Sequence, residues 1–370
     1  MGWPVVSSAG GPRARGRAYG ELARDRVHGS LALYERIFAA YTGLGWDDVR
    51  RRAAAFAEPI DAYDVQLLPE LEGIAEGAGV DAEDILALNV RTEVMYGMDG
   101  GFTRPTPQEC TALCVRAVSA EGGPTIHAEN WDWKPGVADT CVLLACAPHD
   151  RPGFVTLVEA GLLAKCGMNE AGIALTANAL ASSRDRGRPG VPFHAILRRI
   201  LTATTFEEAV EAVTRPWRAA SGNYLVSDAH GHSVNLETGP GGAEAIYETD
   251  APTLAHANHF LWVERPFEDL GRIDGEDSLR RQAAADGAVA AGGTAETLTA
   301  VLRNHEGYPD SVCSHRDPTL APETDHVTIA SLVMRPALRT LQVSQGPPCE
   351  HPYEAVDVAG LVEAARATVA

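Results

Sequence analysis

The chain has 370 residues, of which 45% are hydrophobic and 22% charged, ordinary values for a globular protein that buries a large core. Its 31 Lys and Arg against 50 Asp and Glu give a net charge of −19, which argues against nucleic acid and anionic membranes as partners. No apolar run approaches the roughly 20 residues of a membrane span, and the start lacks the apolar core of a signal peptide, so a cytoplasmic protein is expected.

Residues 17–98 are predicted to be helical. Apolar side chains recur at three- and four-residue steps through "YGELARDRVHGSLALYERIFAAYTG" and form one stripe. Asp81 is the expected N-cap of a later helix, with acidic residues in the first turn. The stretch "GMDGGFTRPTPQE" then combines glycines with two prolines and predicts an exposed loop.

The pattern changes at Cys110, where strand-like runs begin. "CTALCVRAV" and "TIHAENWDW" flank "SAEGGP" and predict a hairpin. Further strands are predicted at 140–147, 154–159, 162–168, 172–178, 223–228, 233–238, 245–248, 326–335 and 339–346, and helices at 193–203, 206–214, 276–290 and 294–303. This order of strands and helix pairs predicts an α+β fold with two sheets face to face, covered by helices.

The cysteines do not form a recognisable metal or redox motif. They are odd in number and scattered, and none lies in a Cys-x-x-Cys pair, so neither a zinc knuckle nor a thioredoxin-type motif is predicted. Such a set suits a reducing cytoplasm, where most thiols are small buried groups. The cysteines are Cys110, Cys114, Cys141, Cys146, Cys166, Cys313 and Cys349.

Cys110 stands where the turn-rich loop meets the first strand. From its position alone, the ordinary interpretation is a buried structural thiol. The alternative is a nucleophile, because the strand would hold the thiol rigidly beside an accessible loop. Asp132, Asn178 and Asn258 could then orient this nucleophile and donate hydrogen bonds to an oxyanion.

No histidine has flanking residues that mark it as the base for a catalytic cysteine. Cleavage of the peptide bond between Glu109 and Cys110 would supply a base of another kind. The freed α-amino group, with an ordinary pKa of about 8, suits a general base at neutral pH. Cys110 would then be nucleophile and base at once.

A set of ordered stretches carries a resemblance to a known family. They are "GIAEGAGVDAEDILALNVRTEVMYG", "ECTALCV", "AENWDW", "EAGLLAKCGMNEAGIALTANAL", "GVPFHAILRRIL", "HANHFL" and "NHEGYPDSVCSH". Together, over roughly three quarters of the chain, they resemble the acyl-CoA:6-aminopenicillanic acid acyltransferase family. Its members are cysteine-type N-terminal-nucleophile hydrolases made as self-cleaving precursors.

The resemblance implies a four-layer αββα sandwich of the N-terminal-nucleophile hydrolase type. It implies autoproteolysis before Cys110, giving a helical pro-segment or α-chain of residues 1–109 that wraps the core and a catalytic β-chain of residues 110–370. No cofactor and no metal are expected.

The resemblance also implies a role for each site residue. Cys110 matches the nucleophile, and Asp132 matches the carboxylate that orients its α-amino group. Asn258 matches the oxyanion-hole side chain, and Asn178 lies where related amidases have a second polar group. The ordinary alternative for these three polar residues is a turn or cap role.

Two positions depart from the family pattern. Glu109 stands where the compared family member has Gly before the nucleophile, which could change the rate of self-cleavage. In "SVCSH", Ser314 replaces an arginine of the family, and Arg316 lies two residues on. For this reason 6-aminopenicillanic acid does not follow as the substrate.

The leading functional hypothesis is therefore a self-processing amidase or acyltransferase that forms a thioester on Cys110. Its substrates would be small acylated amines or amino acids, with an acyl thioester as a further donor class. One alternative is a metal-dependent hydrolase that uses His230, His232, His256 and His259. That set lacks a helical His-Glu-x-x-His frame. The other alternative is a non-catalytic member that does not process itself.

Overall fold

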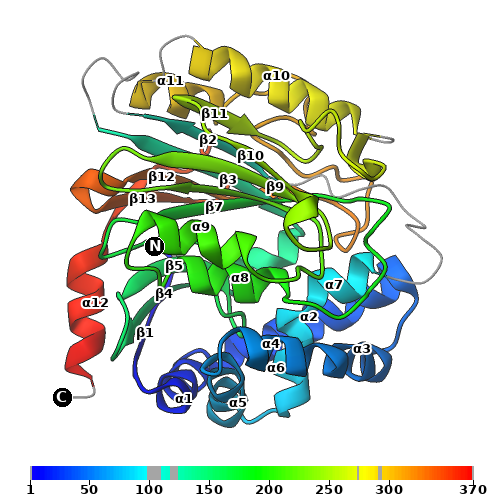
Figure 1. The fold of residues 1–370 in the computed structure, drawn as a ribbon, viewed down its shortest axis with the longest axis vertical. Coiled ribbons are helices and arrows are strands. Elements are labelled where there is room, and N and C mark those ends of the chain that lie inside the picture. Colours follow the sequence, from blue (N-terminus) through cyan, green and yellow to red (C-terminus); the bar gives the residue numbers. More distant parts are fainter. Residues whose placement is uncertain (1, 98–109, 117–123, 273–274, 291–293, 369–370) are drawn as a thin grey trace.

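The computed structural model describes residues 2–97, 110–116, 124–272, 275–290 and 294–368. Two β-sheets stack face to face, and helices cover the outer face of each (Figure 1). α10 (Glu276–Ala290) and α11 (Ala295–Val301) lie over one sheet, and α8 (Phe193–Ile200) and α9 (Phe206–Thr214) lie over the other. The protein is therefore an αββα sandwich of the α+β class, as expected from the sequence.

The larger sheet has eight strands in the order β1-β4-β5-β6-β7-β8-β9-β10. β1 pairs with β4 in parallel, and the other neighbours are antiparallel. The strands are β1 (Val5–Gly10), β4 (Cys141–Pro148), β5 (Phe154–Glu159), β6 (Cys166–Asn169), β7 (Ala174–Ala179), β8 (Gly222–Ser227), β9 (Ser233–Thr238) and β10 (Ile246–Thr249).

The smaller sheet has six strands in the order β11-β2-β3-β12-β13-β14, all antiparallel. Its strands are β11 (Thr253–His256), β2 (Thr111–Val115), β3 (Ile126–Trp133), β12 (Val327–Arg335), β13 (Thr340–Gln345) and β14 (Glu354–Asp357). The final helix, α12 (Val358–Ala367), packs against β1, β4 and β5 of the larger sheet.

The two faces of the smaller sheet have different neighbours, because side chains alternate along each strand. Leu113 and Ala128 pack against Ala285 and Leu298 of the covering helices. On the opposite face, the His127 ring bonds Ser227 Oγ and Thr176 Oγ1 of the larger sheet, both at 2.8 Å. Residues in phase with His127 along β3 therefore lie between the sheets.

The N-terminal helices form a separate layer below the larger sheet (Figure 1). They are α1 (Pro12–Leu22), α2 (Arg24–Thr42), α3 (Trp46–Ala53), α4 (Ala57–Tyr63), α5 (Leu67–Ala78), α6 (Ala82–Asn89) and α7 (Arg91–Tyr96). Glu159 of β5 anchors this layer, since it accepts a hydrogen bond from Tyr34 of α2 at 2.9 Å and pairs with Arg91 of α7 at 2.9 Å.

Most of the elements confirm the sequence-based predictions. The helices expected at 206–214 and 276–290 are found with those bounds as α9 and α10, and the predicted hairpin is the β2–β3 pair. Asp81 caps α6 in a capping box with Asp84, as predicted for the start of that helix. β1, β11, β14 and α12 were not predicted. β14 is a short edge strand with exposed side chains, so it has no alternating apolar pattern to detect.

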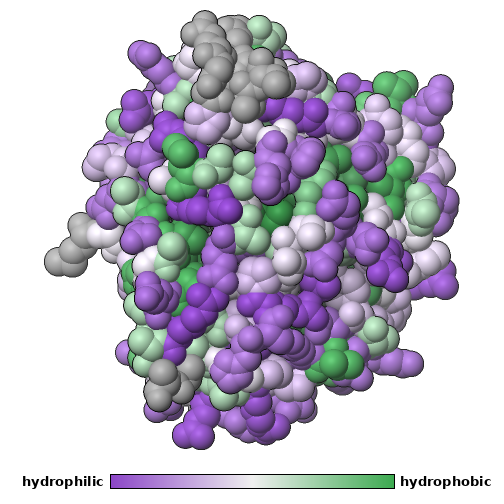
Figure 2. Space-filling view, turned by 60° about the vertical axis from the view of Figure 1, so that its left-hand side comes forward, coloured by the Kyte–Doolittle hydropathy of each residue, from purple (hydrophilic) through white to green (hydrophobic). Residues whose placement is uncertain are grey.

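One face of the molecule is largely hydrophilic, with small hydrophobic areas separated by polar side chains (Figure 2). Single exposed apolar residues are ordinary on a protein surface and do not mark a docking site. Within the described ranges, no helix combines the length and the apolar character needed to cross a membrane.

Helices α1 and α5 approach each other so closely that their backbones touch. A Cβ added at Gly16 would overlap the carbonyl oxygen of Glu70, and one added at Gly77 would overlap that of Arg17. Only residues without a side chain fit at such a crossing. The spacing of glycines on both helices therefore reflects packing.

We expect Gly77→Ala to lower the free energy of unfolding by about 1–3 kcal/mol, because the added methyl group forces the helix pair apart. The matched control is Gly287→Ala in α10, where nothing lies within 4 Å of the added Cβ. That substitution should instead stabilise the protein by roughly 0.5–1 kcal/mol. Urea unfolding of both variants checks this, and equal stabilities would contradict the close packing of α1 and α5.

Candidate active site

Cys110 lies immediately before β2, and its side chain is fully buried. Its φ angle is 38°, in the left-handed region that residues other than glycine rarely adopt. Such a conformation costs of order 1–3 kcal/mol and persists only where the surroundings enforce it. The backbone at this residue is therefore held under strain by its neighbours.

Arg281 of α10 is the neighbour that holds it. Its guanidinium Nη1 donates to the carbonyl oxygen of Cys110 at 2.8 Å and to Thr111 Oγ1 at 3.3 Å. Nη2 donates to Asn258 Oδ1 at 3.0 Å and pairs with Asp277 at 2.9 Å. One buried guanidinium thus connects the start of β2 with Asn258. Arg281 was not predicted as a site residue, although its i, i+4 spacing from Asp277 was a visible signal of a paired arginine.

Asn258 follows β11, and its amide is oriented at both ends. Oδ1 accepts from Arg281, while Nδ2 donates to the Ala179 carbonyl at 3.0 Å. Because a guanidinium can only donate, the oxygen and nitrogen of this amide are assigned without ambiguity. The nitrogen carries two hydrogens, so Nδ2 can serve a second acceptor as well as Ala179.

Asn178 of β7 lies at the junction of the two sheets. Its Nδ2 donates to the carbonyl oxygen of His256 at 3.2 Å, and its Oδ1 accepts from Asn223 at 3.0 Å. His256 lies two residues before Asn258 in the chain. Asn178 therefore supports the segment that carries Asn258.

Asp132 is buried near the end of β3, and its Oδ1 accepts a hydrogen bond from Thr328 at 2.6 Å. In the β2–β3 register Thr111 pairs with Asn130, two residues before Asp132. Asp132 therefore lies at the end of the hairpin where β2 begins. Asp132 and Asn258 approach the start of β2 from different elements, β3 and the segment after β11.

Glu129 was not predicted from the sequence, although it lies in the candidate site. It is fully buried, beside the thiols of Cys110 and Cys166 and the ammonium of Lys165. Burial raises its pKa to about 7, against the opposing effect of Lys165. Near neutral pH this carboxyl can therefore hold or release a proton next to Cys110. The signal was its place in phase with His127 on β3, which directs it between the sheets.

A small cavity of about 10 Å³, large enough for about one water molecule, lies beside Lys165 and Ala179. Its lining includes Trp131, Lys165, Phe193 and Ala179. The Lys165 ammonium lies 5.7 Å from the Trp131 ring centre and 5.6 Å from that of Phe193. A larger cavity of about 690 Å³, between α4 and α9, shares none of this lining. Lys165 lies beside Glu129, and the Ala179 carbonyl accepts from Asn258, so the small cavity is the one that neighbours the candidate site.

The histidines of the alternative metal-hydrolase hypothesis make separate contacts. His256 Nε2 bonds Glu237 at 2.6 Å, and His259 Nδ1 bonds Ser278 at 2.8 Å. His232 pairs with Asp228 at 2.8 Å. Among the residues described, none of them belongs to a group of ligands suited to a metal.

Arg316 pairs with Asp325 at 3.0 Å, and its side chain is about half exposed. Ser314, at the position of the family's arginine, donates its backbone N–H to Thr328 Oγ1 at 2.9 Å. Support for Asp132 at this point therefore comes from a threonine hydroxyl. Glu109 lies outside the described residues.

Comparison with known proteins identifies the family. Residues 118–349 match the family described as acyl-coenzyme A:6-aminopenicillanic acid acyl-transferase. The chain belongs to this family. It is 29% identical over 248 residues to the 40 kDa form of acyl-coenzyme A:6-aminopenicillanic-acid-acyltransferase from Emericella nidulans, a match that covers 66% of this chain and 66% of that protein.

Solved structures with a similar arrangement are more distant. A variant of conjugated bile acid hydrolase from Clostridium perfringens is 13% identical with a TM-score of 0.43, over 68% of this chain and 94% of that one. Penicillin V acylase from Agrobacterium tumefaciens is 15% identical with a TM-score of 0.38, over 64% and 82%.

The raised pKa of Glu129 predicts a pH-dependent stability. A carboxyl whose folded pKa lies above its unfolded value stabilises the fold at low pH, and this contribution is lost as the pH rises toward the folded pKa of about 7. Glu129→Gln removes that dependence. Relative to the parent, the variant should gain on the order of 3 kcal/mol of unfolding free energy between about pH 4.5 and 7.

Urea unfolding across this pH range measures the difference, with Cys110→Ala in both proteins so that processing cannot differ. The buried Glu93, whose pKa burial also raises to about 7, is present in both and cancels. Parallel stability curves for the two proteins would mean that Glu129 titrates normally.

Proposed function

We propose that this chain is a self-processing amidase or acyltransferase that forms a thioester on Cys110 with the acyl group of a small acylated amine or amino acid. The observation that carries the proposal is the Arg281 guanidinium, which joins the Cys110 backbone to the Asn258 amide. This contact supports the proposal because it links the backbone of the proposed nucleophile to the proposed oxyanion donor through one buried side chain. Membership of an acyltransferase family supports the same chemistry.

Self-cleavage is the first step of the proposal. The Cys110 sulfur attacks the carbonyl carbon of Glu109, the C–N bond breaks, and the nitrogen takes a proton to become the α-amino group. Water then hydrolyses the resulting thioester, leaving residues 1–109 and 110–370 as separate chains. The left-handed φ of Cys110 supports this step, because the strain adjoins the bond that breaks.

Turnover uses the same sulfur on a substrate carbonyl. The α-amino group accepts the thiol proton and later returns it to the leaving amine, while the acyl group stays on sulfur. Asp132 orients this amine and favours its ammonium form by charge. Asn258 Nδ2 donates to the oxyanion of the tetrahedral intermediate.

The last step transfers the acyl group to water or to a second amine. An acyl thioester could load Cys110 in the same way as an amide, because both present an acyl carbonyl to the sulfur. The protonated carboxyl of Glu129 is suited to the early part of the cycle, since a neutral neighbour does not oppose formation of the thiolate.

Self-cleavage predicts two polypeptides from one gene product. Intact-mass analysis of purified protein should give masses for 1–109 and 110–370, and two bands should appear on a denaturing gel. Cys110→Ala should remain a single chain, because the attacking sulfur is absent. A wild-type protein that stays full-length after prolonged incubation would point to the non-catalytic alternative.

Asn258→Ala should lower kcat by roughly 100- to 1,000-fold, with a much smaller change in KM, because an oxyanion donor acts on charge that develops only in the transition state. Steady-state kinetics of fully processed protein on acyl-amine substrates measure this. Asn178→Ala serves as the comparison, since its amide supports the segment that carries Asn258 and should cost less. An unchanged kcat with a raised KM would make Asn258 a substrate contact.

A further inference from the structure

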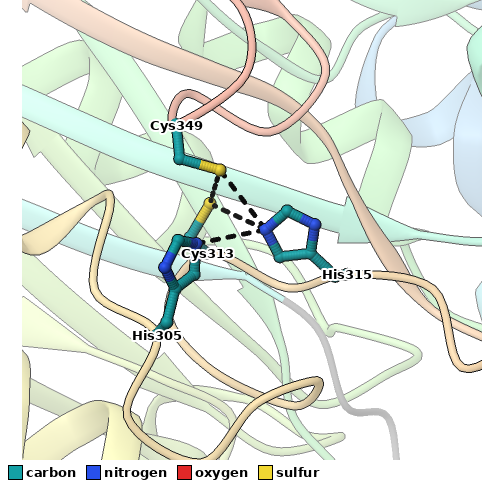
Figure 3. Close-up of side chains that lie close together, drawn as sticks. All are labelled: His305, Cys313, His315 and Cys349. Carbon is teal, nitrogen blue, oxygen red and sulfur yellow. Dashed lines mark hydrogen bonds between the residues drawn. The ribbon is translucent and has the colours of Figure 1, made fainter.

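Four potential metal ligands converge at a place that the proposed chemistry does not use. His305 follows α11, Cys313 and His315 lie in the segment before β12, and Cys349 follows β13. Figure 3 shows the side chains of these residues pointing toward one another from three separate stretches of chain. Each offers one ligand atom, and these atoms all lie within 4.8 Å of one another.

Four of the six distances between the ligand atoms are close to the edges of a tetrahedron around zinc, and the other two, from His305 to the sulfurs, are within 4.8 Å. With Zn–S bonds of about 2.3 Å and Zn–N bonds of about 2.05 Å, the edges are about 3.8 Å for S–S, 3.6 Å for S–N and 3.3 Å for N–N. The sulfurs of Cys313 and Cys349 are 3.5 Å apart. The Cys313 sulfur lies 3.7 Å from His315 Nε2, and the Cys349 sulfur lies 3.3 Å from the same nitrogen. His305 Nε2 and His315 Nε2 are 3.1 Å apart.

The sulfur pair is also informative about the alternative bond. At 3.5 Å, Cys313 and Cys349 are far beyond the roughly 2.05 Å of a disulfide. Two ring nitrogens 3.1 Å apart cannot both point an N–H at each other, so at least one of them presents a lone pair to the cluster. A cation between these four atoms can accept one lone pair from each of them.

The surroundings fit a metal ligand set as well. His315 presents Nε2 to the cluster, and its Nδ1 lies 3.4 Å from the Glu350 carboxylate. A metal-bound histidine ordinarily donates its other ring N–H to such a carboxylate, which fixes the ring and the tautomer. Two thiolates and two neutral imidazoles are the donor set of structural zinc, and two thiolates balance its charge.

We propose that His305, Cys313, His315 and Cys349 bind a structural Zn²⁺ ion. All four coordination positions are taken by the chain, so the ion has no open position for catalysis. Its effect is to join the segment before β12 to the turn after β13. The site differs from a zinc knuckle because only Cys313 and His315 are close in sequence, and this spacing explains why cysteine motifs did not reveal it.

The metal would act next to the candidate active site. Ser314, between two of the ligands, donates its N–H to Thr328 Oγ1, and the Thr328 hydroxyl in turn donates to Asp132. Asn130 of β3 also donates to the carbonyl of Val312 at 2.7 Å. Zinc therefore stabilises the segment that positions Asp132, without touching the reacting atoms.

The test is the zinc content of protein expressed with zinc and dialysed exhaustively, measured by elemental mass spectrometry. We expect about one zinc per chain in the wild type. Cys349→Ser and His305→Ala alter exposed ligands and should lose most of the metal. His351→Gln is the matched control, because His351 is exposed near Cys349 but outside the cluster.

Cobalt gives a second, independent measurement on the wild-type protein. Co²⁺ in place of zinc should show the intense ligand-field absorption of tetrahedral coordination and a thiolate-to-cobalt charge-transfer band. The charge-transfer band should weaken in Cys349→Ser and persist in His351→Gln. A weak, octahedral-type spectrum without charge transfer would overturn the proposal.

Other outcomes would overturn it too. Wild-type protein that neither retains nor takes up zinc does so, as does equal zinc in the wild type and in both ligand variants. A Cys313–Cys349 disulfide in non-reduced protein, seen by peptide mapping with two hydrogens missing, would instead make the pair a redox element. If one ligand variant fails to fold, the other variant and the cobalt spectrum still decide.

Discussion

The bonds of one buried guanidinium hold the candidate active site together. Arg281 is 3% exposed and reaches the Cys110 carbonyl, Thr111, Asn258 and Asp277. A buried cation is stable only when its hydrogens have acceptors. The hydrogen bonds of Arg281 therefore fix the positions of these acceptors as well as that of the guanidinium. Removing the guanidinium would leave Asp277 as a buried carboxylate without its cation and would release the backbone at Cys110.

Two buried carboxyls, Glu70 and Glu129, differ in their charge near neutral pH. Glu70 lies between Arg15 and Arg198. Although burial opposes it, these two cations hold its pKa below the ordinary value, so it stays ionised and joins α5 to α1 and α8. Glu129 is equally buried, but Lys165 opposes burial only in part, so its pKa is raised to about 7. A carboxyl that titrates near neutral pH beside a buried thiol is typical of functional sites.

Much of the fold could be predicted from the sequence, because the apolar residues of most elements recur at the spacing of a helix or of a strand. The alternating hairpin around "SAEGGP" and the helices at 206–214 and 276–290 needed no tertiary information. β1 is short and finds its partner β4 more than 130 residues away, at Leu143 for Val5. β11 lies between two more obvious elements, and no local pattern reports such pairing.

The same limit applies to the site. Cys110, Asp132 and Asn258 could be named because each stands in a recognisable local motif. Glu129 and Arg281 were not named, because their local signals do not show that they lie beside Cys110 and Asn258 in the folded chain. The four zinc ligands are the extreme case: Cys349 is 36 residues from Cys313 in the chain, yet their sulfurs are 3.5 Å apart.

The position of β1 determines whether the two products of the proposed cleavage stay together. Val5–Gly10 is an edge strand of the larger sheet, and it lies on the N-terminal side of the cleavage proposed before Cys110. The smaller product would thus remain attached to the larger one through the backbone hydrogen bonds between β1 and β4. Separating the two products would expose the edge of β4 and the surface under α1 and α2. An exposed strand edge can pair with another chain, so the separated β-chain would be prone to aggregation. We therefore expect the two products of cleavage to stay associated, because they fold together as one precursor before the bond is cut.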